Sequence, residues 1–282
     1  MSTGTETTGG RAPGVDPKVI AAIGSAQRPT PACPLSASLA FGHRALLKIK
    51  HVPEQLFDVT MFPLLFTLMF TFIFGGAISG SWQEYRDYLA PGILCQTVVM
   101  ITMYTAMTIN TDVEKGFFDR VRALPVWRPA LIVGALLGDA LRYTMASAVI
   151  LGALAVLGYR PGGGLVGLVL AVGLLLIFCF SLSWIWTLLG LKLRTQNAVM
   201  GVSMMVLFPL SFLSPVFVSP ETMPGWLEAA VRLNPISPLV DAARGFMDGA
   251  ADGGAVLTVL LVSAGLLVIF GPLTMRTYAN KS

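Results

Sequence analysis

Six long apolar segments dominate this 282-residue chain and limit what it can fold into. They cover residues 59–78, 89–109, 129–157, 165–191, 198–218 and 255–273. A helix needs about 20 residues to cross the hydrocarbon core of a bilayer, and the segments match that length. Only 12% of the residues are charged, against about 25% in a soluble globular domain. Such a chain cannot cover a water-facing surface, so we predict an all-α membrane protein with six transmembrane helices.

The distribution of lysine and arginine predicts the orientation, because cytosolic loops carry the excess of these residues. If the N-terminus is cytosolic, 14 of the 19 Lys and Arg residues lie on the cytosolic side. The other five are Arg142, inside the third segment, and four on the opposite side: Arg86, Arg160, Arg232 and Arg244. We therefore predict that both termini are cytosolic.

The chain before the first segment divides into two parts. Residues 1–34 are rich in Gly, Pro, Thr and Ala and lack the apolar core of a signal peptide, so we predict a disordered cytosolic tail. Residues 35–58 carry apolar side chains at helical spacing and basic ones, including Arg44 and Lys48, mostly elsewhere. This pattern predicts an amphipathic helix in the cytosolic membrane interface, and a plain basic linker is the alternative. Residues 59–282 would then form the transmembrane domain.

A polar block, TDVEKGFFDRVRALPVWRP (111–129), separates the second and third apolar segments. Apolar side chains follow one another at four, four and three residues, which predicts a short amphipathic helix over 112–123 that Pro125 ends: Val113, Phe117, Val121 and Leu124. Asp112 and Glu114 would lie in its first turn and Arg120 and Arg122 in its last, as the helix dipole favours. A solvated turn is the plain alternative. It does not need adjacent phenylalanines, so we interpret Phe117 and Phe118 as part of a docking surface for another protein.

Methionine and aromatic side chains gather in the first, second and fifth segments. In a helix that faces lipid they would be unremarkable. At an interface between two copies they could line a path for a flat amphipathic molecule, since methionine suits loose specificity. The predicted path residues are Phe66, Phe70, Met103, Tyr104, Met107, Met204, Phe208 and Phe212, and the same segments also carry Phe72, Met100 and Met205.

The third segment contains two ionisable residues, Asp139 and Arg142, which can pair because they are three residues apart on a helix. Ionisable residues inside a membrane are costly and often functional. Bracing between helices, gating and substrate contact all stay open for this pair.

The long connection between the fifth and sixth segments predicts two short helices, over 226–233 and 238–247, with Asn234 and Pro235 between them. Leu239, Val240, Ala243 and Phe246 follow helical spacing. Such amphipathic pieces could enter the membrane partly from the outside.

No motif for catalysis or for cofactor or metal binding stands out in the sequence. The three cysteines are far apart, and neither His43 nor His51 has a ligand partner at suitable spacing. The phosphate-binding pattern G-x-x-x-x-G-K-[ST] is absent, so we predict that this chain binds no ATP. The net charge of +4 is too small and dispersed to indicate nucleic-acid binding. We therefore predict a protein that is not an enzyme by itself and that takes its energy from a partner.

Four stretches carry a resemblance to a known family. EKGFFDRVRALPVWRP, YLAPGIL, NPISPLVDAARG and ALLKIKHVPEQLFDVT resemble the membrane subunits of ABC-2 (type V) exporters, in particular the daunorubicin and doxorubicin resistance permeases of actinomycetes. The resemblance covers residues 39–275 and implies a homodimer in a bacterial plasma membrane, working with two copies of an ATPase that binds the ATP and Mg²⁺. It also implies short extracellular helices before the last span. The residues implied in contact with the ATPase are Glu114, Lys115, Gly116, Phe117, Asp119, Arg120 and Arg122, with Arg44 and Lys48 as a second contact.

The implied cargo is a hydrophobic or amphipathic natural product. Two other functions stay open: export of a lipid or lipid-linked glycan, and a membrane scaffold or sensor that transports nothing. An intramembrane enzyme is the weakest reading, because no catalytic constellation is present.

Overall fold

The computed structural model describes residues 61, 63–117 and 130–280, and these residues form helices and no β-strand. The predicted tail (1–34), the predicted interfacial helix (35–58, with Arg44 and Lys48) and three of the predicted contact residues, Asp119, Arg120 and Arg122, lie outside the described residues.

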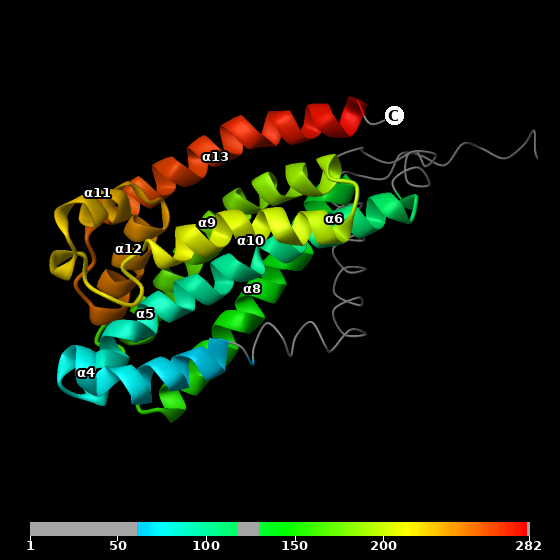
Figure 1. Ribbon diagram of the computed structural model, residues 1–282. Helices are drawn as coiled ribbons and strands as arrows, with labels where there is room; N and C mark the ends of the chain where they lie inside the picture. The colour runs from blue at the N-terminus through cyan, green and yellow to red at the C-terminus, as the bar shows by residue number, and fades with distance from the viewer. Residues whose placement is uncertain (1–60, 62, 118–129, 281–282) are drawn as a thin grey trace, which may run out of the picture.

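The helices lie roughly alongside one another (Figure 1). A first helical segment, Pro63–Ile78, includes the π-helical stretch η1 (Phe70–Phe74) and most of α4 (Gly75–Ser79). The later elements are α5 (Trp82–Ile101), α6 (Met103–Glu114), α8 (Ala130–Val156), α9 (Gly164–Lys192), α10 (Gln196–Phe212), η2 (Pro220–Thr222), α11 (Gly225–Leu233), α12 (Ile236–Asp248) and α13 (Gly253–Asn280). Helices α4, α11 and α12 gather at one end, called the α12 end below, and the C-terminus lies at the other (Figure 1).

Four described helices are long and apolar enough to cross a membrane: Trp82–Glu114 (α5 with α6), Ile132–Val156, Gly164–Lys192 and Gly253–Asn280. Two shorter apolar helices, Pro63–Ile78 and Gln196–Phe212, correspond to the first and fifth predicted segments. The chain is therefore a multi-pass helical membrane protein. The count of six crossings and the cytosolic placement of both termini stay predictions.

The predicted bounds of the second, fifth and sixth segments were wrong. The sixth was expected over 255–273, but α13 continues to Asn280. The second segment was expected over 89–109, but its helices run from Trp82 to Glu114. The start lies earlier because the Ser81 side chain caps the helix, accepting a hydrogen bond from the Glu84 amide at 3.2 Å.

The fifth segment was expected to continue to residue 218, but α10 ends at Phe212. Pro215 follows closely, and a residue before proline is disfavoured in a helix. Val216 and Phe217 are 0% and 7% exposed. They are apolar because they are buried in a loop after the helix.

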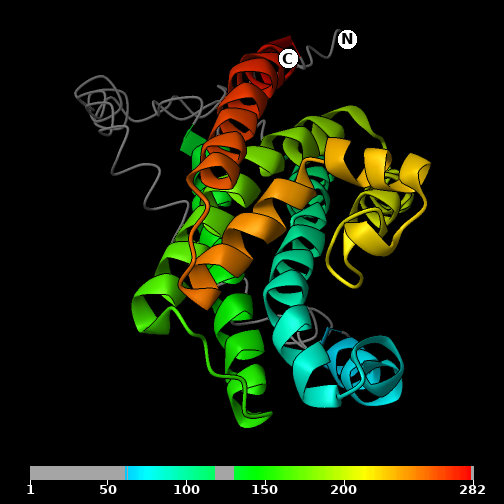
Figure 2. The same cartoon turned by 90° about the vertical axis from the view of Figure 1, so that its left-hand side faces the viewer.

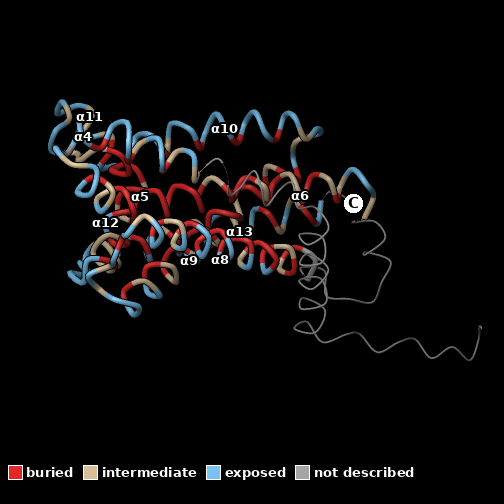
Figure 3. Tube along the Cα trace, turned by 90° about the horizontal axis from the view of Figure 1, so that it is seen from below, coloured by how far each residue is buried: buried red, intermediate tan, exposed pale blue. Residues whose placement is uncertain are grey.

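Helices α5 and α9 form the centre of the fold. Helix α9 packs against α6, α8, α12 and α13, and α5 packs against α4, α8 and α12. Figure 3 shows buried residues concentrated along α5 and α9, whereas most of α10 is exposed. Four of the largest fully buried side chains are Tyr85, Tyr143, Phe178 and Trp186.

Two glycines allow backbones to approach closely. A Cβ at Gly190 of α9 would lie 2.5 Å from the carbonyl oxygen of Ala106 on α6. A Cβ at Gly92 of α5 would lie 2.7 Å from the carbonyl oxygen of Val216. Small residues make such contacts between membrane helices possible.

The loop after α10 is held in place at the α12 end by hydrogen bonds from α5 and α12. The Tyr88 hydroxyl donates to the Pro215 carbonyl at 3.1 Å, and the Tyr85 hydroxyl donates to the Phe217 carbonyl at 3.2 Å. The Arg244 guanidinium of α12 donates to Pro215 at 3.1 Å and lies 4.1 Å from the centre of the Tyr88 ring. Helix α12 lies beside α13 and across the end of α5 in this region (Figure 2).

Candidate functional site

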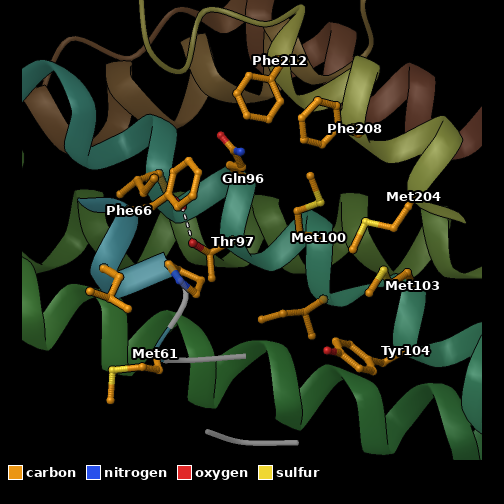
Figure 4. Close-up of a pocket in the computed structure, with 14 residues that line it drawn as sticks. Met61, Phe66, Gln96, Thr97, Met100, Met103, Tyr104, Met204, Phe208 and Phe212 are labelled. Carbon is orange, nitrogen blue, oxygen red and sulfur yellow. Dashed lines mark hydrogen bonds between the residues drawn. The ribbon is translucent and has the colours of Figure 1, made fainter. Parts of the chain in front are cut away.

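An apolar cavity of about 570 Å³ lies between the first helical part of the described chain and helices α5, α6 and α10. Its volume is in the range of small-molecule sites, roughly 300–1,000 Å³. Figure 4 shows the converging side chains: Met61 and Phe66 from the first helical part, Gln96, Thr97 and Met100 from α5, Met103 and Tyr104 from α6, and Met204, Phe208 and Phe212 from α10.

The cavity brings together six of the eight predicted path residues: Phe66, Met103, Tyr104, Met204, Phe208 and Phe212. Phe70 and Met107 are not among the residues that line it. These six residues come from the first segment, α6 and α10, where the sequence has clustered methionine and aromatic residues. Helical spacing brings the side chains of each element to the side that faces the cavity. Contact with a substrate stays a prediction for all eight.

A row of phenylalanine rings borders the cavity toward the α12 end. The ring centres are 4.4 Å apart for Phe208 and Phe212, and 5.5 Å apart for Phe212 and Phe217. Phe70 lies 4.6 Å from Phe217 and 5.4 Å from Phe66. These separations allow favourable aromatic packing. Although Phe70 does not line the cavity, it links the first segment to the loop after α10.

Two polar side chains of α5 are on the cavity wall, and sequence reasoning missed both. Gln96 is 8% exposed and Thr97 is 2% exposed. The Thr97 hydroxyl donates to the Ile93 carbonyl of its own helix at 2.7 Å. The Gln96 Oε1 atom accepts no hydrogen bond from the described residues. The available signal was a single amide side chain inside the apolar segment 89–109.

The predicted pair in the third segment forms within α8 and is buried. Arg142 Nη1 lies 2.8 Å from Asp139 Oδ1. The Thr105 hydroxyl of α6 donates to Asp139 Oδ2 at 2.6 Å and lies 3.1 Å from the Tyr143 hydroxyl, which lies 2.8 Å from the Ser183 hydroxyl of α9. The pair thus belongs to a polar network that connects α6, α8 and α9, an arrangement suited to bracing.

The described part of the polar block lies where α6 ends. Asp112 and Glu114 belong to the last turn of α6, so the prediction that they begin a separate helix was wrong. Residues 118–123 of that predicted helix lie outside the described residues. Helix α6 ends at Glu114 because Gly116 has a φ of +63°, the left-handed conformation that commonly follows a helix. Gly116 was the signal in the sequence. Glu114 and Lys115 are exposed, and Phe117 is half-buried against a small cluster with Ile109 and Leu136.

Gln196 links this end of α6 to the cavity-lining helix α10. Its side-chain amide donates to the Thr111 hydroxyl at 2.9 Å and lies 3.5 Å from Glu114 Oε2. Beside it, the Asn110 amide donates to the Leu193 carbonyl at 2.8 Å. A displacement of the α6 end would therefore reach α10 directly.

The described residues contain no group of three or more His, Cys, Asp or Glu side chains that could hold a metal ion. Their arrangement offers an apolar binding volume, a braced polar network and a polar helix end. The apolar volume suits the binding of a largely apolar molecule.

The family model for ABC-2 type transporters matches residues 38–247. The chain belongs to the ABC-2 type transporter family. The matched range contains every residue that lines the cavity, the buried network and the end of α6.

Two relatives illustrate the range of similarity within this ABC-2 family. The chain is 49% identical over 262 residues to the daunorubicin resistance ABC transporter permease protein of Streptomyces coeruleorubidus, which covers 92% of both chains. It is 24% identical over 208 residues to a Mycobacterium tuberculosis protein named "Probable doxorubicin resistance ABC transporter permease protein", which covers 73% of this chain and 75% of the relative.

Proposed function

We propose that this ABC-2 chain is the permease subunit of an ATP-driven exporter that moves hydrophobic or amphipathic drug-like molecules out of a bacterial cell. The apolar cavity between the first segment, α5, α6 and α10 is the observation that carries the proposal. The family match and the name of the Streptomyces coeruleorubidus relative support the class of transporter and the class of cargo.

The lining of the cavity favours a flat, largely apolar molecule. Phenylalanine rings offer faces for stacking, and methionine side chains adapt to different shapes. No Asp, Glu, Lys, Arg or His is among the described residues that line it. A cargo would therefore be bound mainly through apolar contact.

The end of α6 would receive the energy of ATP hydrolysis by docking on a separate ATPase that holds the ATP and Mg²⁺. Glu114 and Lys115 are exposed beside Phe117, and Gln196 connects this end to α10. Movement at the dock would thus shift the cavity wall formed by Met204, Phe208 and Phe212.

The working assembly would be a homodimer with two ATPase copies and with both termini in the cytosol. An exposed apolar surface borders the cavity: Leu65 is 57% exposed, Met205 79% and Phe208 55%. A second copy on this surface would enclose the cavity between two permease chains.

The experiment is daunorubicin efflux from cells that express the chain with its ATPase, daunorubicin being the drug in the relative's name. We expect Phe117→Ala and Glu114→Ala each to slow efflux about tenfold without lowering membrane abundance, because hot-spot residues dominate docking interfaces. Glu221→Ala is the matched control, since Glu221 is exposed in η2, away from the end of α6.

Purification of the chain in mild detergent shows which proteins are bound to it. A stoichiometric ATPase should accompany the wild-type chain and be reduced with Phe117→Ala. Unchanged efflux in both variants would refute the docking assignment. Transport of a fluorescent lipid without transport of daunorubicin would favour the lipid exporter, and a folded permease without any ATPase would favour the scaffold or sensor.

A further inference from the structure

Gln96 places an amide oxygen without a hydrogen-bond partner among the described residues in a wall that is otherwise almost entirely apolar. The side chain is 8% exposed, and its Oε1 atom has no hydrogen-bond partner among the described residues. Figure 4 shows Gln96 on the cavity wall with the rings of Phe66, Phe208 and Phe212 around it. Burial of an amide without a partner is unfavourable, so the position calls for a group that satisfies it.

The neighbouring polar residue differs in this respect. Thr97 also lines the cavity, but its hydroxyl donates to Ile93 within α5 at 2.7 Å. A threonine satisfied by its own helix is a common structural feature of membrane helices. The Gln96 Oε1 atom has no such partner within its helix. Thr97 is therefore explained by the fold alone, whereas Gln96 is not.

We propose that Gln96 determines specificity by hydrogen bonding to a polar group of the bound molecule. A primary amide contains both a donor and an acceptor, so it suits a hydroxyl, an amine or a carbonyl on a flat, otherwise apolar ligand. A molecule without such a group leaves the amide unpaired and binds more weakly, which is how a site made for a hydrogen bond rejects an analogue that lacks it. This inference rests on the proposed function, because it names the recognition chemistry of the same cavity.

The test compares two probes that differ by one hydroxyl, 1-hydroxypyrene and pyrene. The full chain is purified with its ATPase in lipid nanodiscs, and binding is measured by probe fluorescence, with empty nanodiscs giving the lipid background. We expect the wild-type complex to bind 1-hydroxypyrene about tenfold more tightly than pyrene. Gln96→Leu, which keeps the approximate size, should abolish this preference by weakening 1-hydroxypyrene while pyrene binds as before or more tightly.

The control is Thr97→Val, which should keep the preference because the Thr97 hydroxyl is already satisfied within its helix. Gln96→Met, a second apolar replacement, should repeat the result of Gln96→Leu. A preference that survives both Gln96 replacements, or an equal loss of both probes, would overturn this inference and leave the proposed function standing. A wild-type complex that binds neither probe would also overturn this inference, whereas the proposed function is decided separately by daunorubicin efflux.

Discussion

The buried pair of Asp139 and Arg142 belongs to a network that includes three hydroxyl groups. Thr105 donates to Asp139, and Tyr143 and Ser183 extend the network to α9. A buried charge pair contributes little net stability, but the loss of one partner leaves an uncompensated charge in the interior. The arrangement therefore fits a brace that fixes how α6 and α9 pack on α8.

We expect Asp139→Leu to lower the free energy of unfolding by about 3–5 kcal/mol, because Arg142 then stays buried without its counter-charge. The double replacement Asp139→Leu with Arg142→Met should recover most of this loss. Unfolding of the purified chain in mixed detergent micelles measures both. A single variant as stable as the wild type would show that the pair is no brace. A stable double variant without export would assign the pair a role in transport, such as gating.

Single residues were the hardest features to predict from the sequence. The cluster of methionine and aromatic side chains marked the cavity wall because several residues repeat at helical spacing. Gln96 was missed because one amide hardly changes the hydropathy of an apolar segment. The helix end at Gly116 was missed because the spacing of Val113 and Phe117 also fits one continuous helix that begins at residue 112.

At the scale of the helices, α6 lies close against α9 where Gly190 faces Ala106. Nearby on the same face, the Trp186 indole of α9 donates to the Thr102 hydroxyl at 2.7 Å, at the junction between α5 and α6. The helix that leads to the predicted ATPase dock is thus fixed on α9 by both a backbone contact and a buried hydrogen bond. Its position should be sensitive to one added methyl group.

Gly190→Ala should destabilise the protein by about 1–3 kcal/mol, since the new Cβ would overlap the Ala106 carbonyl. Gly173→Ala on the same helix is the control, because no atom lies within 4 Å of the Cβ it would add. That change should be neutral or stabilise the helix by about 0.5–1 kcal/mol. Thermal unfolding of the two variants side by side distinguishes them, and equal melting temperatures would contradict the close contact.

The positions of the helices were easier to predict than their ends. Hydropathy located all six apolar helices, because a run of apolar residues has to be buried in lipid or in protein. The same reason explains the error at α10: Val216 and Phe217 are buried in a loop, and hydropathy does not distinguish that loop from a span. The helix end depends on Pro215 and on Asn234, which donates to the Leu210 carbonyl at 2.6 Å from a distant part of the chain.

For the molecule as a whole, the number of membrane crossings depends on whether α10 spans the membrane. This helix has 17 residues, fewer than the roughly 20 that a span usually needs. The buried loop after α10 extends its apolar length toward the α12 end. Hydrogen bonds from Tyr85, Tyr88 and Arg244 hold this loop in place. Helices α11 and α12 remain at the same end as this loop (Figure 1). The turn between α9 and α10 and the link between α12 and α13 therefore lie at opposite ends of the protein.

Labelling of single cysteines tests this arrangement and the predicted orientation. Cys95 and Cys179 are buried and stay in place, and Cys33 is replaced by serine to give the unlabelled background. In intact cells a membrane-impermeant maleimide should label Ala251→Cys, exposed between α12 and α13, but not Arg194→Cys, exposed between α9 and α10. Arg194→Cys should react only after the membrane is opened. Reversed labelling would place both termini outside the cell, and labelling of both positions in intact cells would mean that α10 does not cross the membrane and that the chain has fewer than six spans.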